Sequence, residues 1–324
     1  MAAKILLFLI ALTGLAGCRT AGPHTPDQYG TGQQFSANQE EAPWAKQILF
    51  IGNSLTFYND MPATLQKMLN AGNDMFVVYQ STFADRSLTD HARWIGEGRS
   101  NMIWPAGRED LAGEVTADVL TDKQWDLVVL QDATLNILIP GLRSSVFNPA
   151  VMQLDSMIRT TGAQTLLFQS YPLGTYPARY CIDGSLMSMM AGPNETCSPR
   201  FEDSFEEMMV LRRTFRDISH AINADIVPVG DAFEITSFRY PDIPLYVDRY
   251  DQHPSAQGSY LIACLFYNHI TGKRSAGLEE YGGIPVKDAM RLQKVADSFY
   301  HRKQFVRFFN RVLNPGGYML RSRS

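Results

Sequence analysis

The stretch Ile48–Thr56, with the sequence ILFIGNSLT, is the starting point for the fold of this chain. Its first four residues are apolar, which is typical of a strand that is buried on both faces of a sheet. The run breaks at Gly52, and a helical pattern opens near Met61. This order places Ser54 between the end of a strand and the start of a helix. Two roles fit Ser54 there: the N-cap of a helix, and a nucleophile beside a helix N-terminus.

The rest of the chain alternates between strand-like and helix-like segments. Further strands are expected at Met75–Tyr79, Trp125–Leu130, Gln164–Phe168 and Ile226–Val229. Helices are expected at Ser87–Ile95, Val151–Ile158, Phe201–Ile222, Ser255–Ile270 and Val286–Tyr300. Strands separated by helices predict a parallel sheet with crossover helices on both faces. The site of such a sheet lies beyond the carboxyl ends of its strands, and Ser54, Asp85 and Gln131 each follow a strand-like run.

Composition limits the classes of function. The chain has 324 residues, 45% of them hydrophobic, which is enough for the core of one large domain starting near Trp44. The net charge of −4 and the lack of a basic run argue against nucleic acid as a partner. The sequence has no Cys/His ligand spacing and no glycine-rich phosphate loop. We therefore expect neither a metal nor an organic cofactor.

Residues 1–17 are predicted to be a secretion signal. Lys4 provides its positive charge, and Ile5–Leu12 form an apolar run too short for a permanent membrane span. The segment Leu15–Cys18, with the sequence LAGC, resembles the lipobox of bacterial lipoproteins. This resemblance implies that Cys18 becomes the lipidated first residue of the mature protein. An ordinary signal peptide with a chance cysteine is the alternative.

The segment 18–43 is rich in Gly, Pro, Thr, Gln, Ser and Asn and poor in apolar residues. This composition predicts a polar tether that holds the domain 44–324 away from a membrane. Arg19, rather than Asp, follows the cysteine. In this respect the chain resembles Gram-negative lipoproteins that are sorted to the outer membrane. The expected location is therefore the bacterial cell envelope, and within it the outer membrane.

A long irregular insertion at about 174–199 interrupts the alternating pattern and is expected at the rim of the sheet. It contains Cys181 and Cys197. Two cysteines at this spacing in an exported protein favour a disulfide that closes the loop, and two free thiols are the alternative. Cys264 lies in an apolar helical segment and is expected in the core.

His253 differs from the other five histidines of the chain. Pro254 follows it and favours an extended backbone at His253. Asp251 lies two residues earlier, and residues two apart in extended backbone point the same way, so its carboxylate can orient the imidazole. With Ser54, the pair makes a nucleophile, an orienting acid and a base. The Gly-x-Ser-x-Gly elbow of α/β-hydrolases is absent around Ser54.

These residues resemble the SGNH, or GDSL-like, hydrolases. The segment Ile51–Thr56 is similar to the nucleophile block of that superfamily, and Asp251–Ser255 is similar to its terminal block. Val128–Asp132 and Val227–Ala232 resemble segments of a bacterial branch. The resemblance extends from Lys46 to Gly272, and the order and spacing of the blocks make it fairly specific.

The resemblance implies a flavodoxin-like three-layer α/β/α sandwich with a five-stranded parallel sheet. It also implies a serine ester hydrolase that removes short acyl groups, such as acetyl from carbohydrate, with Ser54, His253 and Asp251 as its triad. The oxyanion hole would consist of the Ser54 and Asp85 backbone N–H groups and the Gln131 amide. The expected partners are therefore an acyl ester or acylated glycan and, through Cys18, a membrane.

Three positions depart from the superfamily pattern. The block that carries the oxyanion-hole glycine falls at Phe83–Leu88, which has no glycine. The block asparagine is Gln131, and the residue three before the histidine is Tyr250 rather than Asp. Asp248 is consequently a second candidate to orient His253. Three other functions stay open: an SGNH acyltransferase, an inactive glycan-binding surface lipoprotein, and a flavodoxin-like cofactor binder.

Overall fold

The computed structural model describes the chain between Ala45 and Leu313, with gaps. The described ranges are 45–97, 101–107, 115–116, 120, 123–182, 196–248 and 251–313, with only the backbone described at 101–102, 115–116 and 301–313. All of them belong to one compact unit, Ala42–Ser324. The predicted secretion signal, Cys18 and the tether lie outside the described residues, so the lipid anchor stays a prediction.

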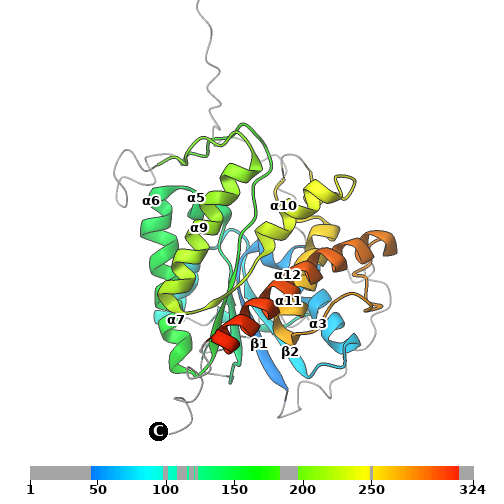
Figure 1. Ribbon diagram of the computed structural model, residues 1–324. Helices are drawn as coiled ribbons and strands as arrows, with labels where there is room; N and C mark the ends of the chain where they lie inside the picture. The colour runs from blue at the N-terminus through cyan, green and yellow to red at the C-terminus, as the bar shows by residue number, and fades with distance from the viewer. Residues whose placement is uncertain are drawn as a thin grey trace, which may run out of the picture. The chain divides into compact units, whose positions relative to one another are not determined.

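A six-stranded sheet forms the central layer of this unit (Figure 1). Its strands, in spatial order, are β4 (Trp104–Pro105), β2 (Phe76–Thr82), β1 (Lys46–Gly52), β6 (Leu127–Leu130), β7 (Gln164–Phe168) and β8 (Asp225–Val227). The last five run parallel, as predicted. The edge strand β4 pairs antiparallel with β2 and was not predicted, because two residues carry no periodicity. A separate pair joins β3 (Asn101–Met102) to β5 (Val115–Thr116).

Helices cover both faces of the sheet. The helices of eight or more residues are α3 (Met61–Ala71), α4 (Leu88–Gly96), α7 (Asn148–Thr160), α9 (Ser204–Ile222), α10 (Val229–Arg239), α11 (Ala256–Thr271) and α12 (Val286–Leu313). Shorter ones are α2 (Ser54–Phe57), η2 (Tyr58–Asp60), α5 (Thr134–Leu138), α6 (Pro140–Leu142) and η4 (Arg143–Phe147). In Figure 1, α7 and α9 lie on one side of the sheet, and α3, α11 and α12 lie on the other.

Alternate side chains of β1 enter two different hydrophobic clusters. Leu49 and Ile51 pack in the cluster that includes residues of α4, α7 and α9. Ile48 and Phe50 pack in the cluster that includes residues of α3, α10, α11 and α12. Successive residues of a strand point to opposite faces, so a strand between two helical layers must be apolar at every position. The predicted three-layer α/β/α fold is confirmed.

Element boundaries follow the predictions closely, with differences that have local causes. β7 has the predicted bounds. α9 begins at Ser204 rather than Phe201, because Asp203 caps it by accepting the Glu206 N–H at 2.9 Å. α12 continues to Leu313, beyond the predicted end at Tyr300. None of the described helices is both long enough and apolar enough to cross a membrane.

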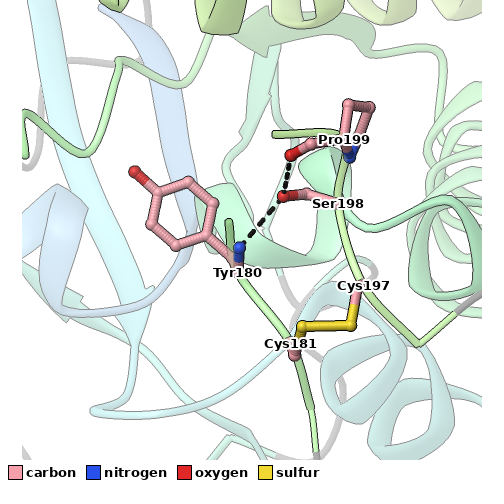
Figure 2. The surroundings of a disulfide bond; sticks show 5 residues. All are labelled: Tyr180, Cys181, Cys197, Ser198 and Pro199. Carbon is pink, nitrogen blue, oxygen red and sulfur yellow. Dashed lines mark hydrogen bonds between the residues drawn. A yellow bond between two sulfur atoms is a disulfide. The ribbon is translucent and has the colours of Figure 1, made fainter. Parts of the chain in front are cut away.

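The predicted disulfide between Cys181 and Cys197 is present and joins two arms of the rim insertion (Figure 2). The arms run antiparallel, and Ser198 exchanges hydrogen bonds with Tyr180 beside the disulfide. The insertion between the two cysteines, at 183–195, lies outside the described residues. Cys264 is a buried free thiol in α11, as expected from its apolar surroundings.

Candidate active site

Ser54 is the first residue of α2 and follows β1 after a single residue. Asn53 caps this helix by accepting the Leu55 N–H on Oδ1 at 3.1 Å. The Asn53 amide also donates to the Arg86 carbonyl at 3.0 Å. Of the two roles that the sequence allows for Ser54, capping therefore falls to its neighbour, which leaves the Ser54 hydroxyl for another partner.

That partner is His253. The Ser54 Oγ lies 2.8 Å from His253 Nε2, and His253 Nδ1 lies 2.6 Å from Asp251 Oδ1. A carboxylate only accepts hydrogen bonds, so Nδ1 carries the imidazole proton and Nε2 accepts the Ser54 hydroxyl. The fold thus brings together the three residues that the sequence predicts as a triad, in the arrangement that general-base activation of a serine requires.

The two candidate acids, Asp251 and Asp248, occupy different places. Asp251 Oδ1 accepts the His253 backbone N–H at 3.0 Å as well as the imidazole. Burial acts to raise the pKa of the Asp251 carboxyl, but these hydrogen bonds outweigh it and lower the pKa. Asp248 Oδ1 accepts the Asp251 N–H at 2.8 Å, so Asp248 holds the loop rather than the imidazole. Tyr250 lies outside the described residues.

Tyr58 also contacts the imidazole, although no sequence motif points to this residue. Its ring stacks on His253, with centroids 4.3 Å apart and planes at 15°. The next residue, Asn59, donates to the Pro254 carbonyl at 2.7 Å. Burial and then the charge of Asp251 raise the pKa of the Tyr58 hydroxyl. These contacts join the helix of the nucleophile to the loop of the base.

Asp85 lies where the SGNH pattern that the sequence resembles has a glycine, and it adopts the backbone conformation that favours glycine. Its φ is 59°, in the left-handed region, where Asp is one of the tolerated residues. Asp85 and Ser54 line the same cavity. Within the described part of the chain, neither backbone N–H donates a hydrogen bond, so both are available for an oxyanion.

Gln131 does not line this cavity, which corrects its predicted place in the oxyanion hole. Its side chain is buried beneath the nucleophile turn, where Oε1 accepts the Asn53 N–H at 2.9 Å and the Thr56 hydroxyl at 2.8 Å. Its Nε2 is buried as well. A Cβ at Gly52 would lie 2.5 Å from Oε1, so a side chain at this position would displace the Gln131 amide. The extra methylene of Gln relative to Asn lets the amide reach the turn.

His91 of α4 is a second buried support of this turn. Its Nε2 lies 2.9 Å from the Gly52 carbonyl oxygen and donates to it, because a carbonyl only accepts. The Gly52 carbonyl and the Asn53 N–H belong to one peptide unit, so His91 and Gln131 hold that unit from both sides. The sequence predicts only a surface or packing role for His91, because nothing in its neighbourhood indicates a partner far away in the chain.

The burial of His91 predicts how the stability of the protein changes with pH. Burial is the main cause that lowers the pKa of His91 to about 4. In the unfolded chain the pKa is about 6.5, so only the unfolded state gains this proton as the pH falls from 6.5 towards 4. The free energy of unfolding should therefore decrease over this interval by up to about 3 kcal/mol from this residue. Urea unfolding at pH 7.5, 6 and 4.5 measures the decrease.

The control is His91→Gln, which can still donate to Gly52 but does not titrate. Buried Asp132, whose pKa burial raises to about 6, contributes with the opposite sign, because its folded state binds the proton first as the pH falls. The difference between wild type and variant removes that contribution. If the free energy of unfolding changed equally with pH in both proteins, the pKa of His91 would be the same in the folded and the unfolded chain, and the prediction would be wrong.

The triad opens onto a cavity of about 700 Å³. Polar residues of its lining include Asp85, Arg86, Ser87, Asp90, Asp251 and Gln252. Aliphatic residues of its lining include Leu55, next to Ser54, and five residues from segments that follow β6 and β7: Leu135, Leu142, Val146, Leu173 and Ile182. A cavity of about 300–1,000 Å³ is the usual size of a small-molecule site. Within the described ranges, no three or more His, Cys, Asp or Glu side chains gather as metal ligands.

Comparison with known proteins bears on the fold. No protein-family model matches the sequence, and no curated protein matches it. Among solved structures, a DUF4886 family protein from Bacteroides uniformis is 16% identical, with a TM-score of 0.57, over 84% of this chain and 96% of its own. The two chains share a fold.

Two further solved structures resemble the chain less closely. A candidate SGNH hydrolase from Slackia heliotrinireducens is 20% identical, with a TM-score of 0.48, over 70% of this chain and 99% of its own. An acetylxylan esterase from Geobacillus stearothermophilus is 16% identical, with a TM-score of 0.43, over 70% of this chain and 94% of its own. At such identities a likeness shows a fold and not a reaction. The chemistry has to be argued from the site.

Proposed function

We propose that this protein is a serine ester hydrolase of the SGNH type. The observation that carries the proposal is the continuous hydrogen-bond chain from Ser54 through His253 to Asp251, at 2.8 and 2.6 Å. Ser54 follows the carboxyl end of β1 after one residue, and Asp251 and His253 lie in the segment before α11; the carboxyl ends of the strands are where sites of open parallel sheets lie. The sequence blocks that resemble SGNH hydrolases contain the same residues.

The reaction proceeds in two steps. Ser54 Oγ attacks the acyl carbon while His253 Nε2 takes its proton, and the carbonyl oxygen becomes an oxyanion held by the Ser54 and Asp85 N–H groups. The ester C–O bond then breaks, and the alcohol leaves with the proton from Nε2. Water attacks the acyl-Ser54 ester, again losing its proton to Nε2, and the carboxylic acid departs as Ser54 is regenerated.

A fluorophosphonate probe tests this proposal directly. The probe phosphonylates a serine only where a base activates it, so we expect one adduct, on Ser54, and hydrolysis of p-nitrophenyl esters that the adduct blocks. Absence of both would favour the inactive glycan-binding lipoprotein. Product analysis with an added sugar acceptor separates hydrolysis from acyl transfer, because a transferase would give an acylated sugar.

The predicted lipid anchor places this activity in the bacterial cell envelope, as part of the same proposal. If the lipobox-like segment before Cys18 is processed, a fatty-acid analogue fed to expressing cells should label the wild type and not Cys18→Ser. Membrane fractionation of the two proteins gives a second readout. Equal labelling of both would remove the anchor and leave the ester hydrolase proposal unchanged.

A further inference from the structure

The rim insertion contributes a closed hairpin beside the active-site cavity. We call its described arms, 178–182 and 196–201, the stapled hairpin. Ala178 and Phe201 exchange two backbone hydrogen bonds at 2.9 and 2.8 Å, and the Ile182 N–H donates to the Thr196 carbonyl at 3.0 Å. The disulfide lies between these two points (Figure 2). Ile182, next to Cys181, lines the cavity of Ser54.

A buried carboxylate holds the base of this hairpin. Glu207 of α9 is fully buried, and its Oε1 accepts the Leu173 N–H at 2.8 Å. Its Oε2 accepts the hydroxyls of Tyr176 at 2.7 Å and Tyr180 at 3.2 Å. A buried carboxylate costs free energy unless it is hydrogen-bonded, and here two hydroxyls of the insertion and the N–H of the residue just before it satisfy the carboxylate. Glu207 therefore ties the insertion to the body of the domain.

Leu173 and Ile182 line the Ser54 cavity together with other aliphatic residues. Leu173 and Ile182 lie on the insertion side, and Leu135, Leu142 and Val146 come from the segment after β6. Leu135 is 38% exposed and lines the same cavity as Ser54. An apolar surface rimmed by polar residues is typical of a ligand-binding site. We call these five side chains the aliphatic wall.

We propose that the aliphatic wall binds the acyl chain of an ester longer than acetate, and that Glu207 is the positioning residue for its Leu173–Ile182 side. This inference rests on the proposed ester hydrolase function and revises the expected acetyl group. A two-carbon acyl group would leave most of the wall in water. The polar side of the lining, which includes Arg86 and Gln252, suits the alcohol part of the substrate.

The expected effect is a selectivity between acyl chains. When a hydrophobic pocket fits an acyl chain, a substrate that lacks methylenes of that chain has a kcat/KM that is lower by about 10-fold or more. Wild type should therefore hydrolyse p-nitrophenyl hexanoate with a kcat/KM at least about tenfold above that for the acetate ester. Ile182→Ala and Leu142→Ala should each lose most of this preference, because KM for hexanoate rises more than KM for acetate.

The matched control is Val286→Ala, an exposed aliphatic residue of α12 outside the cavity lining, which should leave the preference unchanged. Glu207→Ala should lose the hexanoate preference, whereas Glu207→Gln should keep it because an amide still accepts the Leu173 N–H. If Glu207→Ala fails to fold, reduction of the Cys181–Cys197 disulfide in the folded wild type provides the same readout. Reduction should raise KM for hexanoate and leave kcat for acetate unchanged.

Two results would overturn the inference. One is a wild type that hydrolyses both esters without preference, and the other is an equal loss for both esters in the wall variants and after reduction. A wild type that hydrolyses neither ester and takes no fluorophosphonate would instead overturn the proposed function, and this inference with it. Fluorophosphonate labelling therefore distinguishes a wrong proposal about acyl binding from a wrong proposal about the hydrolase function.

Discussion

Ser54→Ala should abolish ester hydrolysis, with a loss in kcat on the order of 10⁶-fold. In the proposed mechanism Ser54 Oγ forms the acyl-enzyme, and the variant removes this atom; among the described residues, no other hydroxyl is hydrogen-bonded to His253 Nε2. Fluorophosphonate labelling should disappear with the activity. Single-turnover rates with a p-nitrophenyl ester, compared with hydrolysis in buffer alone, measure the loss.

The matched control is Ser298→Ala on α12, whose hydroxyl donates to the Val295 carbonyl of its own helix. It should keep wild-type turnover and labelling. Thermal unfolding of all three proteins separates a lost nucleophile from a lost fold. Residual turnover above a few per cent in Ser54→Ala would mean that Ser54 is not the nucleophile, and the proposed mechanism would fail.

The parallel sheet could be predicted because its strands carry a strong local signal. β1 and β7 contain continuous apolar runs, Ile48–Ile51 and Leu166–Phe168, whose side chains pack in one helical layer or the other. β4 carried no such signal: it has two residues, and its second, Pro105, suits only an edge. Its place depends on pairing with β2, which a local pattern cannot encode.

The Asp251–His253 pair could be predicted for the same reason, because both residues lie in one short extended segment before a helix. The residues that hold the nucleophile turn, Gln131 and His91, could not be predicted in these roles. Gln131 looks like a strand-end amide aimed at the rim, and only the close approach of Gly52 shows that it turns beneath the chain. His91 and Tyr58 likewise take their roles from partners that are distant in sequence.

The role of Glu207 at the rim insertion also could not be predicted from the sequence. In the sequence it resembles an ordinary acidic residue in the first turn of a helix, where a negative charge is favourable. In the fold it is fully buried, and its partners lie in a segment without regular structure. Burial raises the pKa of this carboxyl, and the hydrogen bonds from Tyr176 and Leu173 counteract that rise. Only the arrangement of the loop reveals this role.

Asp251→Asn should lower kcat by about 10⁴-fold with little change in shape. The carboxylate fixes the proton of His253 on Nδ1, which leaves Nε2 free to accept the Ser54 hydroxyl. An asparagine amide can donate to Nδ1 instead, and this favours the tautomer with the proton on Nε2. In that tautomer Nε2 cannot act as a base towards Ser54.

Asp248→Asn is the matched control, because it makes the same chemical change three residues away. Asp248 Oδ1 accepts the Asp251 backbone N–H at 2.8 Å, and the amide oxygen of Asn can accept that bond equally well. We therefore expect this variant to stay within a few-fold of wild type. Circular dichroism of both variants checks that each is folded before the kinetics are compared.

The three patterns of result assign the orienting group without ambiguity. A severe loss in Asp251→Asn alone supports the triad that the hydrogen bonds describe. A severe loss in Asp248→Asn alone would mean that the working enzyme rearranges this loop and that Asp248 faces the imidazole. Small losses in both, with Ser54→Ala and His253→Ala inactive, would describe a Ser/His dyad. In that case the stacking of Tyr58 on His253 would be the remaining contact that orients the ring.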